Sequence, residues 1–172
     1  MVVDDIVKLL GMEPHPEGGY YKRSYIASDE ISLPTRYNDN KKRPSSTCIY
    51  YLLGKNDFSA WHRIKSDEIW HHYEGATVTI FTIDPKTHEI SKHALGKLTD
   101  GAVPQVIVKH GLWFCASLSG EGDFGLCGCT VSPGFDFRDF ELADRSEFVA
   151  EYPEHETLVQ KYTKDISKVP LD

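Results

Sequence analysis

The sequence lacks a long hydrophobic run, and its start lacks the cations of an export signal. No apolar stretch approaches the roughly 20 residues that a membrane helix needs. The first twelve residues, MVVDDIVKLLGM, carry two acids where a signal peptide would carry positive charges. We therefore expect a cytoplasmic protein with no membrane partner.

The sequence also lacks an excess of basic residues. Lys and Arg number 19 against 26 Asp and Glu, which gives a formal net charge of −7. A surface of this sign repels phosphate backbones unless a basic patch is segregated. The densest basic run, at 41–43, lies in a polar stretch typical of a solvated loop. We expect no nucleic-acid partner.

The cysteines contain no CxxC pair. The two closest in sequence, Cys127 and Cys129, are two residues apart, and this spacing on a strand places both side chains on one face. The pattern does not match a zinc site. Together with Cys48 and Cys115 they are predicted to be free thiols, mostly packed as small buried side chains.

What the chain does contain is a succession of short segments rich in Tyr, Ile, Val, Phe and Thr. Clusters of Gly, Pro, Asn, Asp and Lys separate them. This alternation predicts strands joined by short turns, and many short strands in close succession indicate a sandwich or a barrel. The predicted strands are 19–27, 46–54, 57–64, 67–74, 76–83, 89–95, 104–109, 112–118 and 123–131.

Helical spacing appears only near the two ends of the sequence. Apolar residues recur at i, i+3, i+4 and i+7 in the segment 2–10, and a second short helix is expected near 154–162. Residues 28–44 form the longest irregular segment and are expected to be a loop or a covering arm. The length of 172 residues suits a single domain over 1–172, with its barrel at about 19–140.

His62 and Glu68 are the first pair of residues that indicates chemistry. They lie on a predicted strand–turn–strand segment, and such a hairpin can direct both side chains into one interior. A carboxylate beside an imidazole can orient it as a general base, join it as a metal ligand, or satisfy a buried polar group. The alternative is a surface hairpin on which both side chains face water.

The second strand of this hairpin carries an unusual set of side chains. Alternation places Glu68, Trp70 and His72 on one face and His71 on the other. An acid, an indole and an imidazole on one face suit a polar pocket with an aromatic wall, as for a sugar or a nucleobase. If the register is reversed, His71 replaces His72 as the inward residue.

Further ligand contacts are expected from an arginine, whose planar fork suits an anion, and from residues with stacking or hydroxyl groups. These candidates are Tyr20, Arg23, Thr47, Tyr50 and Trp113. The glycines of EGGY and the segment PGFDF at 133–137 are interpreted mainly as turns. With His62 inward, Trp61 points outward, which suits a homodimer interface unless residues 28–44 cover it.

Several segments together match one known family. His62, Glu68 and Gly75 follow the first cupin motif at its usual spacings, and EGGYYKRSY (17–25) and CTVSPGFDFRDFEL (129–142) match elsewhere. The chain resembles the cupin-5 family of largely uncharacterised cupins. The resemblance implies an all-β cupin double-stranded β-helix, or jelly-roll barrel, with short N-terminal and C-terminal helices. It also implies a relation to deoxysugar epimerases and phosphomannose isomerases, and a homodimer.

The sequence departs from metal-binding cupins at two positions. Ile64 stands where they place the second His of HxH, and Phe114 stands where the second motif places its ligand His. Neither side chain can ligate a metal, so we expect no cofactor and assign Phe114 to the pocket wall. A non-standard divalent metal site would use His62, Glu68 and His72.

These features predict a cupin that binds a small polar metabolite, such as a sugar or nucleotide-sugar, in its barrel. As an enzyme it would be an isomerase or epimerase that abstracts a proton beside a carbonyl without a metal. Neutral His62 would be the base, oriented by Glu68 or a neighbour, with Tyr50 or His72 as acid. A non-catalytic binding protein and a metal-dependent cupin are the alternatives.

Overall fold

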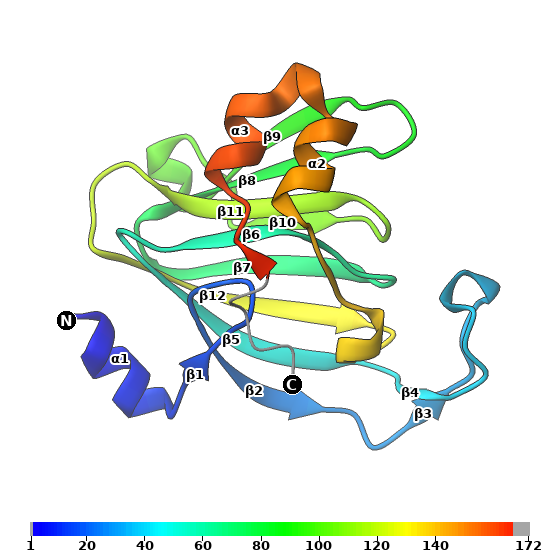
Figure 1. The fold of residues 1–172 in the computed structure, drawn as a ribbon. Helices are drawn as coiled ribbons and strands as arrows, with labels where there is room; N and C mark the ends of the chain where they lie inside the picture. The colour runs from blue at the N-terminus through cyan, green and yellow to red at the C-terminus, as the bar shows by residue number, and fades with distance from the viewer. Residues whose placement is uncertain (1, 167–172) are drawn as a thin grey trace.

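Two antiparallel β-sheets form the body of the computed structural model, which describes residues 2–166 (Figure 1). The six-stranded sheet contains, in spatial order, β1 (Glu13–Pro14), β2 (Tyr20–Ile26), β5 (Thr47–Gly54), β12 (Phe124–Ser132), β7 (Asp67–Gly75) and β10 (Gln105–Val108). The five-stranded sheet contains β13 (Glu141–Leu142), β6 (Phe58–Arg63), β11 (Trp113–Ser119), β8 (Thr77–Ile83) and β9 (Ile90–Leu95).

The chain passes from one sheet to the other at almost every step between β5 and β13. This winding closes the two sheets into the double-stranded β-helix, or jelly roll, and confirms the predicted fold class. Each of the nine predicted strands overlaps an observed one. The strands that the sequence did not predict are the two-residue elements, which are too short to carry a periodic pattern: β1, β13, β3 (Glu30–Ile31) and β4 (Arg43–Pro44).

Three α-helices flank the sheets. α1 (Val3–Leu10) matches the predicted N-terminal helix, and α3 (Glu156–Lys161) lies inside the predicted C-terminal one. α2 (Arg145–Glu151) was not predicted, although the Asp144 carboxylate caps it by accepting from the Glu147 N–H. Figure 1 shows α2 and α3 over the outer face of the five-stranded sheet. None of the helices in the described part of the chain is long and apolar enough to cross a membrane.

The C-terminal helices change the interpretation of Trp61. Its side chain points away from the barrel interior, but it is 0% exposed because it packs against Phe148 of α2. Its indole N–H donates to the Leu158 carbonyl at 3.3 Å. Neither a partner subunit nor residues 28–44 cover it, so the argument for a dimer from an exposed Trp61 was wrong.

Residues 28–44 form an arm that projects beside the barrel (Figure 1). It holds the β3–β4 ribbon and the short 3-10 helix η1 (Thr35–Tyr37). The fully buried Arg43 anchors it, because its guanidinium donates to both carboxylate oxygens of Asp139 at 2.8 and 2.9 Å. This ion pair ties the arm to the segment that follows β12.

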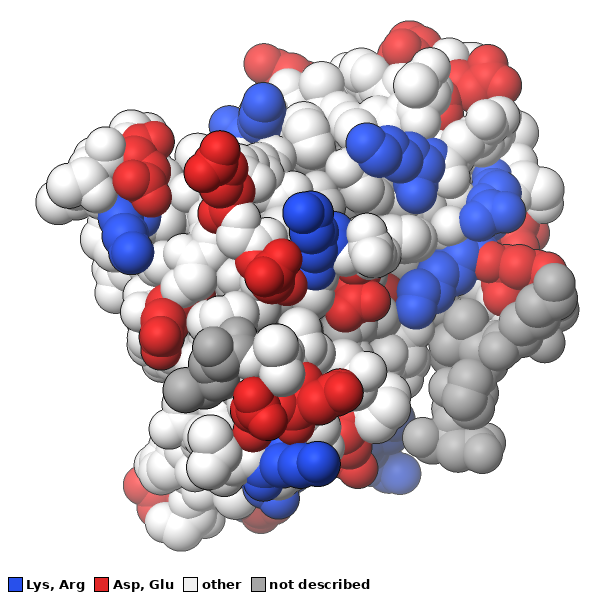
Figure 2. Space-filling view, turned by 90° about the vertical axis from the view of Figure 1, so that its left-hand side faces the viewer, with Lys and Arg blue, Asp and Glu red and all other residues white. Residues whose placement is uncertain are grey.

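The charged side chains do not form a segregated basic region on the face seen in Figure 2, where acidic and basic residues are interspersed. The predicted domain of 1–172 also includes residues 1 and 167–172, which lie outside the described residues.

Candidate functional site

A cavity lies inside the barrel, between β2, β5, β12 and β7 of one sheet and β6 of the other. It offers about 40 Å³ to the centres of water-sized molecules, which is room for about three waters. With its mouth included, the empty space is about 550 Å³. Its lining consists of His15, Glu17, Tyr21, Arg23, Thr47, Ile49, His62, Ile64, Glu68, Cys129, Val131, Phe135 and Phe137.

His62 lies at the end of β6, 2% exposed, with its ring 4.0 Å from the ring of Phe114. Its Nδ1 faces the Ala60 carbonyl oxygen at 2.6 Å, and its Nε2 faces a carboxylate oxygen of Glu17 at 2.9 Å. A carbonyl and an ionised carboxylate only accept hydrogen bonds, so both ring nitrogens carry protons. The site therefore holds an imidazolium.

The pKa of His62 agrees with this geometry. Burial acts to lower it, but the charge of Glu17 and the hydrogen bond to it raise the pKa above the usual 6.5. His62 was predicted to be a neutral base, and the structure contradicts this. Its two protons are already committed to oxygen acceptors, so its ring has no free lone pair to accept a third.

Glu17 comes from the turn between β1 and β2, and the local backbone explains its position. The Ala60 N–H donates to the Glu17 carbonyl at 2.7 Å, which fastens the turn to β6. Gly18 and Gly19 follow with φ of 115° and 69°. A Cβ on Gly18 would collide with the Phe58 carbonyl, so the close approach requires glycine.

The Glu17 carboxylate is 6% exposed and ionised. Burial acts to raise its pKa, but the charge that His15 carries once it is protonated at acidic pH, the charge of His62 and the His62 hydrogen bond lower it to about 2. Glu17 and His15 were not predicted as site residues, because the glycines of EGGY indicated mainly a turn. The feature of the sequence that could have indicated them is a His and a Glu two residues apart, immediately before the glycine pair.

His15 contributes a neutral ring to the cavity wall. Its Nδ1 accepts the Glu17 backbone N–H at 3.1 Å, which leaves that nitrogen unprotonated. Burial lowers the pKa of His15 below 6.5, in agreement with this hydrogen bond. The ring packs edge-on against Tyr21, with centroids 4.7 Å apart.

Glu68 projects from β7 into the same cavity and is 8% exposed. The sequence predicted a direct partnership with His62, but Glu17 takes that position. Burial and the charge of Glu17 raise the pKa of Glu68 to about 7, against the opposing effect of His62. A carboxyl with this pKa gains and loses its proton near neutrality, which suits general acid–base catalysis.

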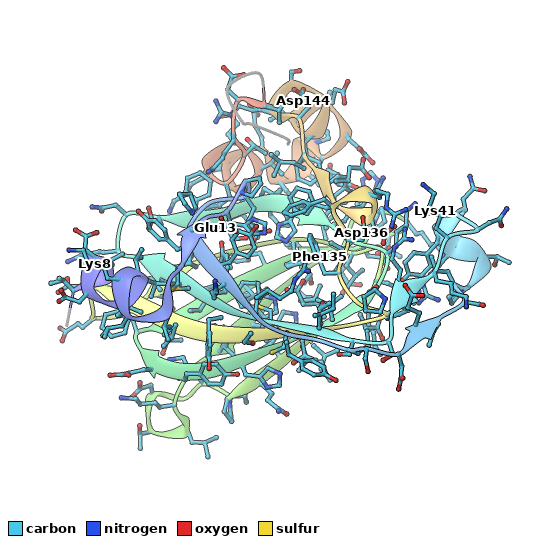
Figure 3. All side chains as sticks on the ribbon, turned by 90° about the horizontal axis from the view of Figure 1, so that it is seen from below. Lys8, Glu13, Lys41, Phe135, Asp136 and Asp144 are labelled. Carbon is cyan, nitrogen blue, oxygen red and sulfur yellow. The ribbon has the colours of Figure 1, made fainter. Side chains whose placement is uncertain are left out.

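Thr47 and Arg23 also lie where the sequence predicted ligand contacts. The Thr47 hydroxyl oxygen accepts the Phe135 N–H at 2.9 Å, and Arg23 is an exposed side chain at the cavity lining. Phe135, labelled in Figure 3, follows β12 at the end of the barrel beside the arm. Because Phe135 and Phe137 line the cavity, the PGFDF segment is more than the turn we expected.

Three predicted contacts lie farther along the barrel than this cavity. Trp70 and Phe114 are 1% and 0% exposed and belong to the apolar core between the sheets. His72 is near the far end of β7, where its Nε2 lies 3.2 Å from the Ala76 carbonyl oxygen. The predicted faces are correct, since the ring of His71 lies 3.0 Å from the Thr130 hydroxyl on the other side. The cavity lies beside the start of β7, so among the inward residues of this strand only the first, Glu68, lines it.

The other three predicted contacts face away from the barrel interior. Tyr20 and Tyr50 pack in the apolar cluster under α1. Trp113 packs against Phe148 of α2, with the guanidinium of Arg63 4.4 Å from its ring centre. None of these three lines the cavity, because strand alternation places them on the outer faces of the sheets.

The cavity does not fit a metal ion of the kind that many cupins hold. Ile64 and Phe114 occupy two ligand positions, and the donors of His62 are bound to Glu17 and Ala60. His72, the proposed third ligand, is not among the cavity residues. Within residues 2–166 no group of three or more His, Cys, Asp or Glu side chains is arranged to hold a metal ion.

Comparisons with known proteins agree with this architecture. The family described as Cupin_5, Cupin superfamily (DUF985), matches residues 4–143. A hypothetical protein from Leishmania major is similar with a TM-score of 0.86 and 28% identity, covering 95% of this chain and 99% of that one. A protein from Shewanella oneidensis is similar with a TM-score of 0.84 and 36% identity, covering 95% and 98%.

More distant structures share the fold alone. An oxalate decarboxylase from Lactobacillus farciminis has a TM-score of 0.55 at 11% identity, covering 94% of this chain and 42% of that one. No curated protein matches the sequence.

Proposed function

We propose that this chain, which belongs to the Cupin_5 family (DUF985) of the cupin superfamily, binds a small polar metabolite in its barrel cavity and moves a proton on it. The family membership confirms the resemblance of its motifs. The observation that carries the proposal is the buried Glu68, with a pKa of about 7, beside the Glu17–His62 ion pair.

In this proposal Glu68, rather than His62, is the base. Its carboxylate takes a proton from a carbon beside a carbonyl, and electron density moves to the carbonyl oxygen. The positive charge of His62, held by Glu17, stabilises that oxygen electrostatically. Glu68 then returns its proton to the former carbonyl carbon, while the hydroxyl proton on the carbon that lost hydrogen moves to the former carbonyl oxygen. This completes an isomerisation without a metal or redox partner; an epimerisation would require a second group that protonates the opposite face of the same carbon.

The lining indicates which ligands suit the cavity. Its enclosed part admits only a small group, and aromatic rings of Tyr21, Phe135 and Phe137 surround it. Arg23 offers a planar fork for a carboxylate or phosphate on the same molecule. A sugar or nucleotide-sugar would therefore place its reacting end inside and its larger part at the mouth.

The experiment that tests the proposal measures exchange of carbon-bound hydrogen for deuterium by NMR, with hexose phosphates and sugar nucleotides in D2O. Glu68→Gln is expected to slow exchange by about 10²-fold or more. Glu74→Gln, an exposed carboxyl on the same strand, is the matched control and is expected to exchange like the unmodified protein. Exchange that survives Glu68→Gln would exclude Glu68 as the base.

The same experiment separates the alternatives. Ligand binding without any exchange would identify the non-catalytic binding protein. Exchange that disappears after chelation and returns with a divalent metal would identify a metal-dependent cupin.

We also propose a cytoplasmic homodimer, as the family resemblance implies. A row of side chains crosses the outer face of the six-stranded sheet through Tyr25, Cys48, Thr130, Ile69 and Ile107, each paired with the next. Tyr25 and Ile107, the residues at its two ends, are each 56% exposed, and no residue of the row is charged. Such a surface suits contact with a second copy, and light scattering at low concentration tests it.

A further inference from the structure

A second, larger cavity lies outside the barrel wall, and no step of the proposed reaction uses it. It offers about 470 Å³ to the centres of water-sized molecules, roughly ten times the barrel cavity. Ile64 lines both cavities and separates them. The second cavity lies between the arm, the turn from β6 to β7 and the segment before β13. Its titratable lining residues are Arg36, Arg63, Lys65, His110, Arg138, Asp139 and Glu141.

Most of these charges are already compensated inside the protein. Arg63 pairs with Glu141 at 2.7 Å. Arg138 pairs with Asp136 at 2.7 Å outside the lining. Asp139 pairs with the buried Arg43, as described above.

Arg36 and Lys65 are the exceptions. Within residues 2–166 neither has a carboxylate at ion-pair distance, although acids outnumber bases in this chain. Both side chains instead contact neutral groups. The Arg36 Nε donates to the Lys65 carbonyl at 2.9 Å, and the Lys65 Nζ donates to the Tyr37 carbonyl at 2.8 Å.

These reciprocal hydrogen bonds hold two like charges together at one cavity. Each cation donates to a backbone carbonyl on the other's segment, so neither can turn away without losing a bond. Both cations line the same cavity, so an anion that binds between them is attracted by both. The arm, through Arg36, and the β6–β7 turn, through Lys65, thus present two hydrogen-bonded cations to one cavity.

We propose that this cavity binds the phosphoryl group of a small phosphorylated metabolite through Arg36 and Lys65. The guanidinium of Arg36 retains donors for two phosphate oxygens, and the ammonium of Lys65 has two more protons to donate. Two unpaired cations match a dianion better than a single carboxylate. The remaining volume accommodates an attached group of metabolite size. The site does not depend on proton transfer by Glu68.

The test is isothermal titration of inorganic phosphate and of a hexose phosphate in phosphate-free buffer at low salt. Arg36→Gln and Lys65→Gln are each expected to weaken binding by about tenfold or more, since each removes a charge-assisted hydrogen bond. Lys42→Gln is the matched control: it removes the same charge from an exposed position in the same arm, outside the cavity lining. It is expected to bind like the unmodified protein.

Several outcomes decide the proposal. Tighter binding of the hexose phosphate than of phosphate, lost in both cavity variants, supports a phosphorylated metabolite. Equal binding of the two, lost in the same way, supports a site for phosphate itself. Absence of millimolar binding, or equal weakening in all three variants, would overturn the proposal. Thermal melting of each variant verifies that it is folded, and unchanged proton transfer in Arg36→Gln would show that the two sites act separately.

Discussion

Replacing Glu68 by Gln should remove a loss of stability that the native protein suffers as the pH rises. The native carboxyl keeps its proton up to a pKa of about 7, whereas an unfolded Glu releases it near its usual 4.5. Between these values the native state binds more protons than the unfolded state. The free energy of unfolding therefore decreases as the pH rises through this window, and the contribution of a neutral Glu68 is gone above pH 7.

The magnitude follows from the two pKa values. Their difference, at about 1.4 kcal/mol per pH unit, amounts to about 3 kcal/mol. Glu68→Gln keeps the shape but cannot ionise, so near pH 8 it should be more stable than the unmodified protein by up to this amount. For a chain of this length that corresponds to a melting temperature about 6–12 °C higher.

Urea unfolding near pH 5 and near pH 8 measures the effect. The unmodified protein and Glu74→Gln should each lose more stability between these pH values than Glu68→Gln does, by about 2–3 kcal/mol. The pKa of His62 is also raised, so the loss of its proton with rising pH lowers the free energy of unfolding as well. This contribution is present in all three proteins. An identical loss in all three would show that Glu68 ionises freely in the native state and would refute the reasoning.

Three further predictions test the packing around the site. Glu17→Gln should lower the free energy of unfolding by about 3 kcal/mol at pH 7, because it leaves the buried imidazolium of His62 unpaired. Urea unfolding measures this loss, and NMR titration should show a lower pKa for His62. Gly18→Ala should lower the free energy of unfolding by about 2 kcal/mol or more. Gly120 also has a positive φ but has open space where a Cβ would lie, so Gly120→Ala should lower it by less than half as much, as thermal melting of the two variants measures. Iodoacetamide followed by mass spectrometry, at a protein concentration where light scattering finds a monomer, should modify the partly exposed Cys48 well before Cys127, whose pKa burial raises to about 12.

The amino-acid pattern was sufficient to predict most of the strands and the N-terminal helix. These elements depend on local properties, namely alternation with period 2 or 3.6 and turn residues at the segment ends. The same alternation correctly placed Glu68 and Trp70 inward and His71 outward. α2 was missed because Phe148 is its one fully buried residue, so its segment shows no apolar repeat at helical spacing.

The partner of His62 was beyond what the sequence could reveal. Glu17 lies 45 positions away, and only the paired backbone of its turn and β6 brings the carboxylate to the imidazole. That contact reverses the predicted roles, because it fixes a proton on each nitrogen of His62 and leaves Glu68 as the group that titrates near neutrality. Charge states in a buried site depend on neighbours and solvent exclusion, which are properties of the assembled fold.

Which side chains reach the cavity was likewise decided by the tertiary structure. Strand alternation gives the face of a residue but not its depth along the barrel, so Trp70 and His72 share the face of Glu68 without reaching its cavity. The outward Trp61 and Trp113 are covered by helices that follow far later in the chain. The sequence by itself determined the strands and their two faces through local periodicity, whereas the cavity, its ion pair and its protons depend on contacts between segments that only folding brings together.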